Sequence, residues 1–142
     1  MRGLFAHPRI DDTRIRAVRP MLPPAILAEE VPLTEKAAMR VERWRRDIEH
    51  SLSGEDPRLV VIAGPCSIHD PASALDFAAH LAEMQSRFPS LLLVMRAYFE
   101  KPRTTVGWKG LINDPDLNGS FHVNKGLRLA RRLLLDVNEL GL

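Results

Sequence analysis

The sequence has little of several features that would place it in a specialised class of protein. Its single cysteine, Cys66, cannot form an internal disulfide, which indicates a reducing compartment. The longest stretch without a charged residue or histidine, residues 59–68, is far shorter than the ~18 apolar residues of a membrane helix, and residues 1–12 lack the apolar segment of a signal peptide. We therefore expect a cytoplasmic protein that does not bind membranes.

The excess of positive over negative charge is also small. The 20 lysines and arginines exceed the 18 acidic residues by only two, which gives no support to nucleic-acid binding, and we expect none. The glycine-rich nucleotide loops and the GxSxG motif of hydrolases do not occur. What is present is typical of one packed globular domain: 142 residues, of which 45% are hydrophobic and 27% charged.

Composition divides the chain into three parts. Residues 1–33 are rich in proline, which predicts an extended arm with one short helix that does not fold by itself. Residues 34–58 predict a helix and a linker, because Thr34 is a good N-cap, apolar residues follow at helical spacing, and Gly54 ends the pattern. Residues 59–142 alternate apolar runs with amphipathic segments, which favours strands and helices in turn.

The last part predicts an α/β fold with parallel strands. Residues 59–63 and 91–99 are short apolar runs, typical of strands that are buried on both faces of a parallel sheet. Helices are expected over about 71–87 and from about residue 123 to Gly141. Two such βα units cannot close a parallel sheet, so we expect either strong oligomerisation or a chain that is the front part of a larger fold.

The turn after the first predicted strand contains the cysteine. Cys66 stands where a strand ends and a helix is about to begin, and α/β folds gather ligands at the carboxyl ends of parallel strands. A thiolate there suits a divalent transition metal, but a lone cysteine is also commonly a small buried hydrophobe. His69 completes a Cys-x-x-His pair, which falls short of the four ligands of a closed metal site and equally suits packing of the turn.

The second predicted strand leads into a cluster of positive charge. Its members are the cations Arg96, Lys101, Arg103 and Lys109, with the single acid Glu100. An arginine among apolar strand residues is costly to bury without an anion, so Arg96 is a strong candidate for ligand binding. The hydroxyls of Thr104 and Thr105 can complete a phosphate-binding pocket, and a solvated charged loop is the alternative. Trp108 either anchors this loop or lines a pocket, and we favour the anchor.

Three blocks of sequence resemble one enzyme family. They are residues 64–70 (GPCSIHD), 95–115 (MRAYFEKPRTTVGWKGLINDP) and 126–131 (GLRLAR). On these blocks the chain resembles the type I 3-deoxy-7-phosphoheptulonate (DAHP) synthases, and residues 1–58 resemble the N-terminal extension of that family. The resemblance implies the first two βα units of a (β/α)₈ TIM barrel preceded by a helical extension, because a whole barrel needs roughly 250 residues.

The resemblance also implies an activity and roles for individual residues. The activity is the condensation of phosphoenolpyruvate with erythrose 4-phosphate, the first step of the shikimate pathway. Cys66 would bind a divalent cation of the Mn, Fe, Co or Zn class, whereas the family's remaining His, Glu and Asp ligands lie on later strands, beyond these residues. Arg96 and Lys101 would hold phosphoenolpyruvate, with Lys101 also catalytic beside the aldehyde. Arg103 and Thr104 would hold the phosphate of erythrose 4-phosphate.

The arm has an implied regulatory role. In the family such extensions pack against a neighbouring subunit of a homo-oligomer, and Asp11 or Asp12 would lie near the amino group of an aromatic amino acid that inhibits by feedback. An exposed terminus is the alternative. Two hypotheses about function follow. Either this is part of an enzyme whose activity resides in a longer polypeptide, or it is a non-catalytic short chain that binds synthase subunits and modulates them.

Overall fold

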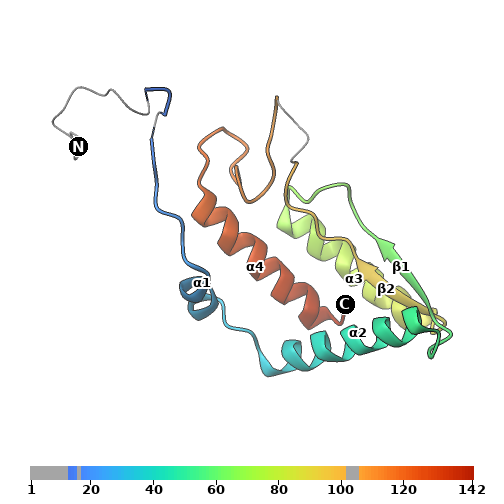
Figure 1. The fold of residues 1–142 in the computed structure, drawn as a ribbon. Coiled ribbons are helices and arrows are strands. Elements are labelled where there is room, and N and C mark those ends of the chain that lie inside the picture. The colour runs from blue at the N-terminus through green and yellow to red at the C-terminus, as the bar shows by residue number, and fades with distance from the viewer. Residues whose placement is uncertain (1–12, 16, 102–105) are drawn as a thin grey trace.

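A two-stranded parallel sheet and two long helices form the C-terminal part of the fold (Figure 1). The computed structural model describes residues 13–15, 17–101 and 106–142. In chain order the elements are α1 (Pro24–Glu30), α2 (Glu35–Ser53), β1 (Leu59–Ala63), α3 (Pro71–Arg87), β2 (Leu91–Met95) and α4 (Val123–Leu140). The fold is therefore α/β, and the predicted order of elements is confirmed.

Local capping explains where the two central helices begin. The Thr34 hydroxyl accepts a hydrogen bond from the Ala37 N–H at 3.1 Å, so Thr34 is the N-cap of α2, as predicted. Asp70 caps α3 by accepting from the N–H groups of Ala72 and Ser73, and proline follows at the first helical position. Gly54 ends α2 in the left-handed conformation with φ 83°, which glycine adopts without strain.

The second strand is shorter than the sequence predicts. The register pairs Leu59 with Leu91 and continues to Ala63 with Met95, where β2 ends, so the prediction of a strand over 91–99 is wrong at its C-terminal end. The Arg96 N–H still donates to the Ala63 carbonyl at 2.7 Å, but β1 then turns away and leaves the next residues without a partner strand. An isolated antiparallel bridge further on pairs Glu100 with Gly110.

The main core lies between the sheet and the helix pair α3 and α4 (Figure 1). Ile68, Leu111 and Leu133 are fully buried in it. Burial of both faces of the sheet, which the apolar run of β1 predicts, is not observed for Ile62, whose side chain is 68% exposed. Ile62 pairs with Val94 in the sheet, whereas the core cluster contains Leu93 and Met95, whose side chains alternate to the other face.

Residues 24–53 are tied to α4 and have little core of their own. Arg128 forms an ion pair with Glu30, and the Arg131 Nε donates to the Val31 carbonyl at 2.7 Å. Helix α2 runs across the C-terminal end of α4, where Arg40 Nη1 donates to the Asn138 carbonyl at 2.7 Å (Figure 1). Among the described residues, no helix is long and apolar enough to cross a membrane.

Candidate functional site

The ends of the two strands meet at one edge of the sheet. Because β1 and β2 are parallel and in register, the turn that begins at Gly64 lies beside Arg96. A Cβ atom at Gly64 would lie 2.6 Å from the Arg96 carbonyl oxygen and 2.9 Å from the Arg96 Cβ. Only glycine therefore permits this approach, which brings the Cys66 turn against the first residue of the predicted cationic cluster.

The Arg96 side chain bridges the two strand ends. Its Nη1 donates to the Pro65 carbonyl at 2.5 Å and also to the Cys66 carbonyl, and its guanidinium lies 4.8 Å from the centroid of the Tyr98 ring. Arg96 is half-buried. Its Nε and Nη2 make no hydrogen bond with any described residue, so one edge of the planar fork is left to bind an anion such as a carboxylate.

Cys66 is exposed to solvent, so the described residues do not bury it as a small hydrophobe. His69 is also exposed, and its ring meets the Trp108 ring edge-on, with centroids 6.5 Å apart and an interplanar angle of 89°. The described part of the chain contains no group of three or more His, Cys, Asp or Glu residues that could hold a metal ion. Cys66 can therefore offer one thiolate, but the described residues alone do not make a metal site.

Lys101 stands at the base of the cationic loop. Its backbone N–H donates to the Lys109 carbonyl at 3.0 Å, which closes the loop next to the Glu100–Gly110 bridge. Its Nζ lies 6.0 Å from the centroid of the Trp108 ring. Arg103 and Thr104, the other predicted substrate-binding residues of this loop, lie outside the described residues, as do Asp11 and Asp12 of the arm.

Trp108 anchors the second half of the loop, as predicted from the sequence. Its ring packs against the core cluster, and its Nε1 donates to the Asp114 carbonyl at 2.7 Å. Asp114 organises the same turn but is not among the residues predicted from the sequence. Asp114 is buried, with 6% of the residue exposed, and its carboxylate accepts from the Gly119 N–H at 3.0 Å. The Asp114-Pro115 pair and the following Gly119 are typical turn residues, and these were the signal available in the sequence.

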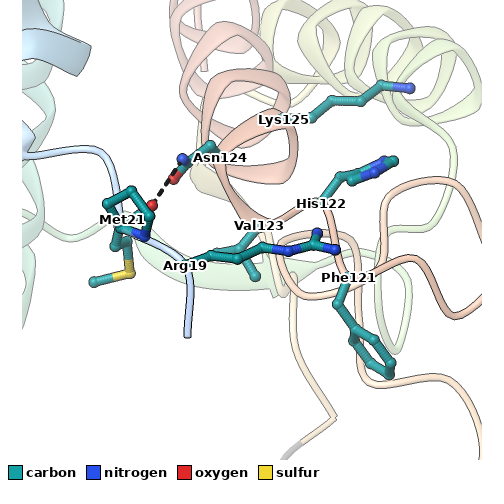
Figure 2. A pocket seen from close by; sticks show the side chains of 8 residues that line it. Arg19, Met21, Phe121, His122, Val123, Asn124 and Lys125 are labelled. Carbon is teal, nitrogen blue, oxygen red and sulfur yellow. Dashed lines mark hydrogen bonds between the residues drawn. The ribbon is translucent and has the colours of Figure 1, made fainter. Parts of the chain in front are cut away.

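A separate hollow of about 430 Å³ lies between residues 19–21 and the start of α4, residues 121–125 (Figure 2). The Asn124 side chain joins its two sides, donating to the Pro20 carbonyl at 3.1 Å and accepting from the Leu22 N–H at 2.8 Å. Nearby, hydrogen bonds from Lys125 and then from His122 hold the pKa of Asp116 below its ordinary value. None of the predicted site residues lines this hollow, so its size does not mark it as the candidate site.

Comparison with known proteins gives the affiliation of the chain. The sequence profile of the DAHP synthetase I family matches residues 30–139, which is most of the sequence. The chain belongs to this family. A solved structure of a phospho-2-dehydro-3-deoxyheptonate aldolase from Francisella tularensis SCHU S4 superposes with a TM-score of 0.86 at 47% identity, over 90% of this chain and 38% of that one. The resemblance recognised in the sequence is confirmed.

Relatives in the family are longer than this chain. A phospho-2-dehydro-3-deoxyheptonate aldolase of Amycolatopsis methanolica is 54% identical over 94% of this chain and 66% of its own length. Escherichia coli K12 relatives named Phe-sensitive and Trp-sensitive are 53% and 55% identical, each over 38% of its own length. The chain thus spans under two thirds of the length of these relatives.

Proposed function

We propose that the protein formed by this chain, together with the further length its relatives have, condenses phosphoenolpyruvate with erythrose 4-phosphate. Water is consumed, and the products are 3-deoxy-D-arabino-heptulosonate 7-phosphate and inorganic phosphate. This transferase reaction is the cytoplasmic first step of the shikimate pathway and of aromatic amino-acid synthesis. The observation that carries the proposal is the contact between Arg96 and the Cys66 turn at one sheet edge, in a chain that belongs to the DAHP synthetase I family.

In this proposal the α/β part is the beginning of a larger barrel. The units β1–α3 and β2–α4 would be the first two of eight, with residues 1–33 as an arm and residues 34–58 as a helix and linker before them. Barrel enzymes bind substrates at the carboxyl ends of their strands. The exposed Ile62 side chain supports this arrangement, because such a position becomes buried when further strands close the sheet.

The chemistry requires two anionic substrates side by side. C3 of phosphoenolpyruvate attacks the aldehyde carbon of erythrose 4-phosphate, water adds at C2, and phosphate leaves. Fixed cations offset the mutual repulsion of the substrates and hold the reacting carbons together. We assign the Nε and Nη2 edge of Arg96 and the ammonium of Lys101 to phosphoenolpyruvate, with Lys101 also beside the aldehyde. Arg103 and Thr104 are assigned to the phosphate of erythrose 4-phosphate.

Cys66 is proposed as one ligand of a divalent cation of the Mn, Fe, Co or Zn class. Its exposed thiol and its place at the strand end support this role. A bound cation would act as a Lewis acid toward a developing alkoxide. Cys66→Ser should lower the metal content of the purified protein and remove most of its metal-dependent activity, since a hydroxyl is a poor ligand for transition metals. Unchanged metal content would remove Cys66 from the site.

Steady-state kinetics test the substrate assignments. Residues 1–142 can replace the matching part of the Escherichia coli Phe-sensitive relative, which supplies the remaining length. Arg96→Ala should raise KM for phosphoenolpyruvate by roughly 10- to 100-fold, the loss expected for hydrogen bonds to a charged group. Arg103→Ala should raise KM for erythrose 4-phosphate instead. Arg43→Ala, an exposed arginine on α2, is the control and should change neither.

Two results would contradict the assignments. If each arginine variant affected only the other substrate, the two anion sites would be reversed. If the unsubstituted protein bound neither substrate and formed no product, catalysis would be the wrong function. A non-catalytic role in binding synthase subunits would then be the better explanation.

We also propose that an aromatic amino acid inhibits the enzyme and that the arm joins its subunits. The names of the Phe-sensitive and Trp-sensitive relatives support the first part, and the hydrogen bonds of residues 20 and 22 to Asn124 support an ordered arm. Asp11 or Asp12 would lie near the amino group of the inhibitor. Deletion of residues 1–33 should weaken inhibition and association while condensation persists. If inhibition and oligomeric state are unchanged, the arm has no such role.

A further inference from the structure

Trp108 is held rigidly from one side. Its Nε1–H donates to the Asp114 carbonyl, and Asp114 is itself fixed, because its N–H donates to the Gly110 carbonyl at 2.9 Å and its carboxylate accepts from Gly119. The indole also packs against the main core cluster. A side chain with its polar edge bonded and its apolar body packed has little freedom to reorient.

The other contacts of the Trp108 ring join two candidate site segments. The ring meets His69, which belongs to the turn that follows β1, and the Lys101 ammonium lies at its face, at the start of the loop that follows β2. The Lys101 ammonium makes no hydrogen bond or ion pair with any described residue. Among the residues that the structure describes, the indole is therefore the group available to hold this long, flexible cation.

We propose that Trp108 is a positioning residue for Lys101. Its indole face holds the ammonium at the carboxyl edge of the sheet and keeps it aligned with the Cys66–His69 turn before substrate arrives. This role rests on the proposed function of Lys101 in holding phosphoenolpyruvate. An ammonium held in place loses less conformational freedom when the anion binds, so the indole should strengthen that binding without touching the substrate.

Proton NMR of the 142-residue chain tests the contact itself. The ε-methylene protons of Lys101 should be shifted upfield by the ring current of Trp108, with the resonance assigned through Lys101→Arg. Trp108→Leu should abolish the shift, and Trp108→Phe should retain part of it because a ring face remains. Trp44→Leu is the matched control, since Trp44 lies on α2 and should leave Lys101 unaffected. If Trp108→Leu leaves the Lys101 resonance in place, the proposal is wrong.

The effect of Trp108 on substrate binding is tested by measuring phosphoenolpyruvate affinity in the longer protein, in which the Escherichia coli Phe-sensitive relative supplies the remaining length. Trp108→Leu should weaken phosphoenolpyruvate binding about fivefold, as expected for loss of one cation–π contact, with KM for erythrose 4-phosphate unchanged. Trp108→Phe should recover most of the affinity. In a Lys101→Met background, Trp108→Leu should have no further effect, because the group that it positions is gone.

The outcomes separate this proposal from the proposed function. If Lys101→Met weakens phosphoenolpyruvate binding but Trp108→Leu does not, the positioning role fails and the function of Lys101 stands. If Lys101→Met has no effect either, the assigned function of Lys101 fails first. Equal effects of Trp108→Leu with and without Lys101 would also overturn the proposal, because they would indicate a general loss of structure.

Discussion

Gly126, in the first turns of α4, offers a sharp test of how the loop before this helix is held. A Cβ atom at this position would lie 2.2 Å from the Ile112 carbonyl oxygen, 2.6 Å from the Ile112 Cα and 2.6 Å from the Leu111 carbonyl oxygen. All three are backbone atoms, so no side-chain rotation can relieve the contact. The helix and the 111–112 backbone must separate for any larger residue to fit.

Two opposing effects set the size of the change in Gly126→Ala. Alanine is favoured over glycine inside a helix by about 1 kcal/mol. Forcing an extra methyl group into a packed contact costs roughly 1–3 kcal/mol, and here the neighbour includes Leu111, which is 1% exposed in the main core. Rigid backbone favours the upper end of that range, so we expect a net destabilisation of about 1–2 kcal/mol.

Urea unfolding of the 142-residue chain, followed by circular dichroism and tryptophan fluorescence, measures this difference. Arg132→Ala is the control, because Arg132 is an exposed residue on the same helix and its replacement should change stability by no more than about 0.5 kcal/mol. A midpoint for Gly126→Ala that equals or exceeds that of the unsubstituted chain would refute the argument, since helix propensity would then outweigh the close approach.

Two further predictions concern the edge of the sheet and acid stability. The Gln85 side-chain amide donates to the Leu91 carbonyl at 2.7 Å and accepts from the Leu93 N–H at 2.8 Å. Gln85→Ala should therefore destabilise the chain by about 1–3 kcal/mol and speed hydrogen exchange at the Leu93 amide. Unchanged exchange at Leu93 would contradict this prediction. The Thr34 hydroxyl holds the pKa of Glu139 below its ordinary value of 4.5, so the carboxylate favours the folded state above that pH, and this contribution is lost as the pH falls through the lowered pKa. The melting temperature should therefore decrease as the pH is lowered below 4.5, and it should decrease less steeply in Glu139→Gln than in the unsubstituted chain. If the melting temperatures of the two proteins depended on acid pH identically, the contact would be excluded as a cause.

Local signals were sufficient to predict α2, α3 and α4. Thr34 and Asp70 bind N–H groups within three residues of themselves, and Gly141 ends α4 with φ 111°, so each boundary depends on its immediate neighbours. The same is true of β1, whose apolar run ends at a glycine and a proline. Features that a residue's own sequence neighbours determine are those that periodicity and capping can predict.

Features that depend on a distant partner were not predicted. The apolar run after Leu91 continues past Met95, but a strand ends where its neighbour turns away, and that event belongs to β1. The buried Asp114 and the pairing of Gln85 with β2 were not predicted either, although their partners are close in sequence, because no periodic pattern marks those partners. Exposure of Cys66 could not be read from residue type, because lone cysteines are commonly buried.

Close backbone approaches at two glycines build most of the frame of the candidate site, and the Arg96 side chain adds hydrogen bonds to the Pro65 and Cys66 carbonyls. Gly64 allows the Arg96 backbone to approach the Cys66 turn, and Gly126 allows α4 to approach the loop that continues from Lys101. The Lys101 ammonium takes part in neither approach, so Lys101→Met should remove a charge while leaving the strand ends in place, whereas Arg96→Ala also removes the hydrogen bonds to the Pro65 and Cys66 carbonyls. Substitution of Gly64 should move the strand ends, and substitution of Gly126 should move the 111–112 backbone, while leaving every charge present. The two kinds of variant separate the binding chemistry of the site from the fold that assembles it.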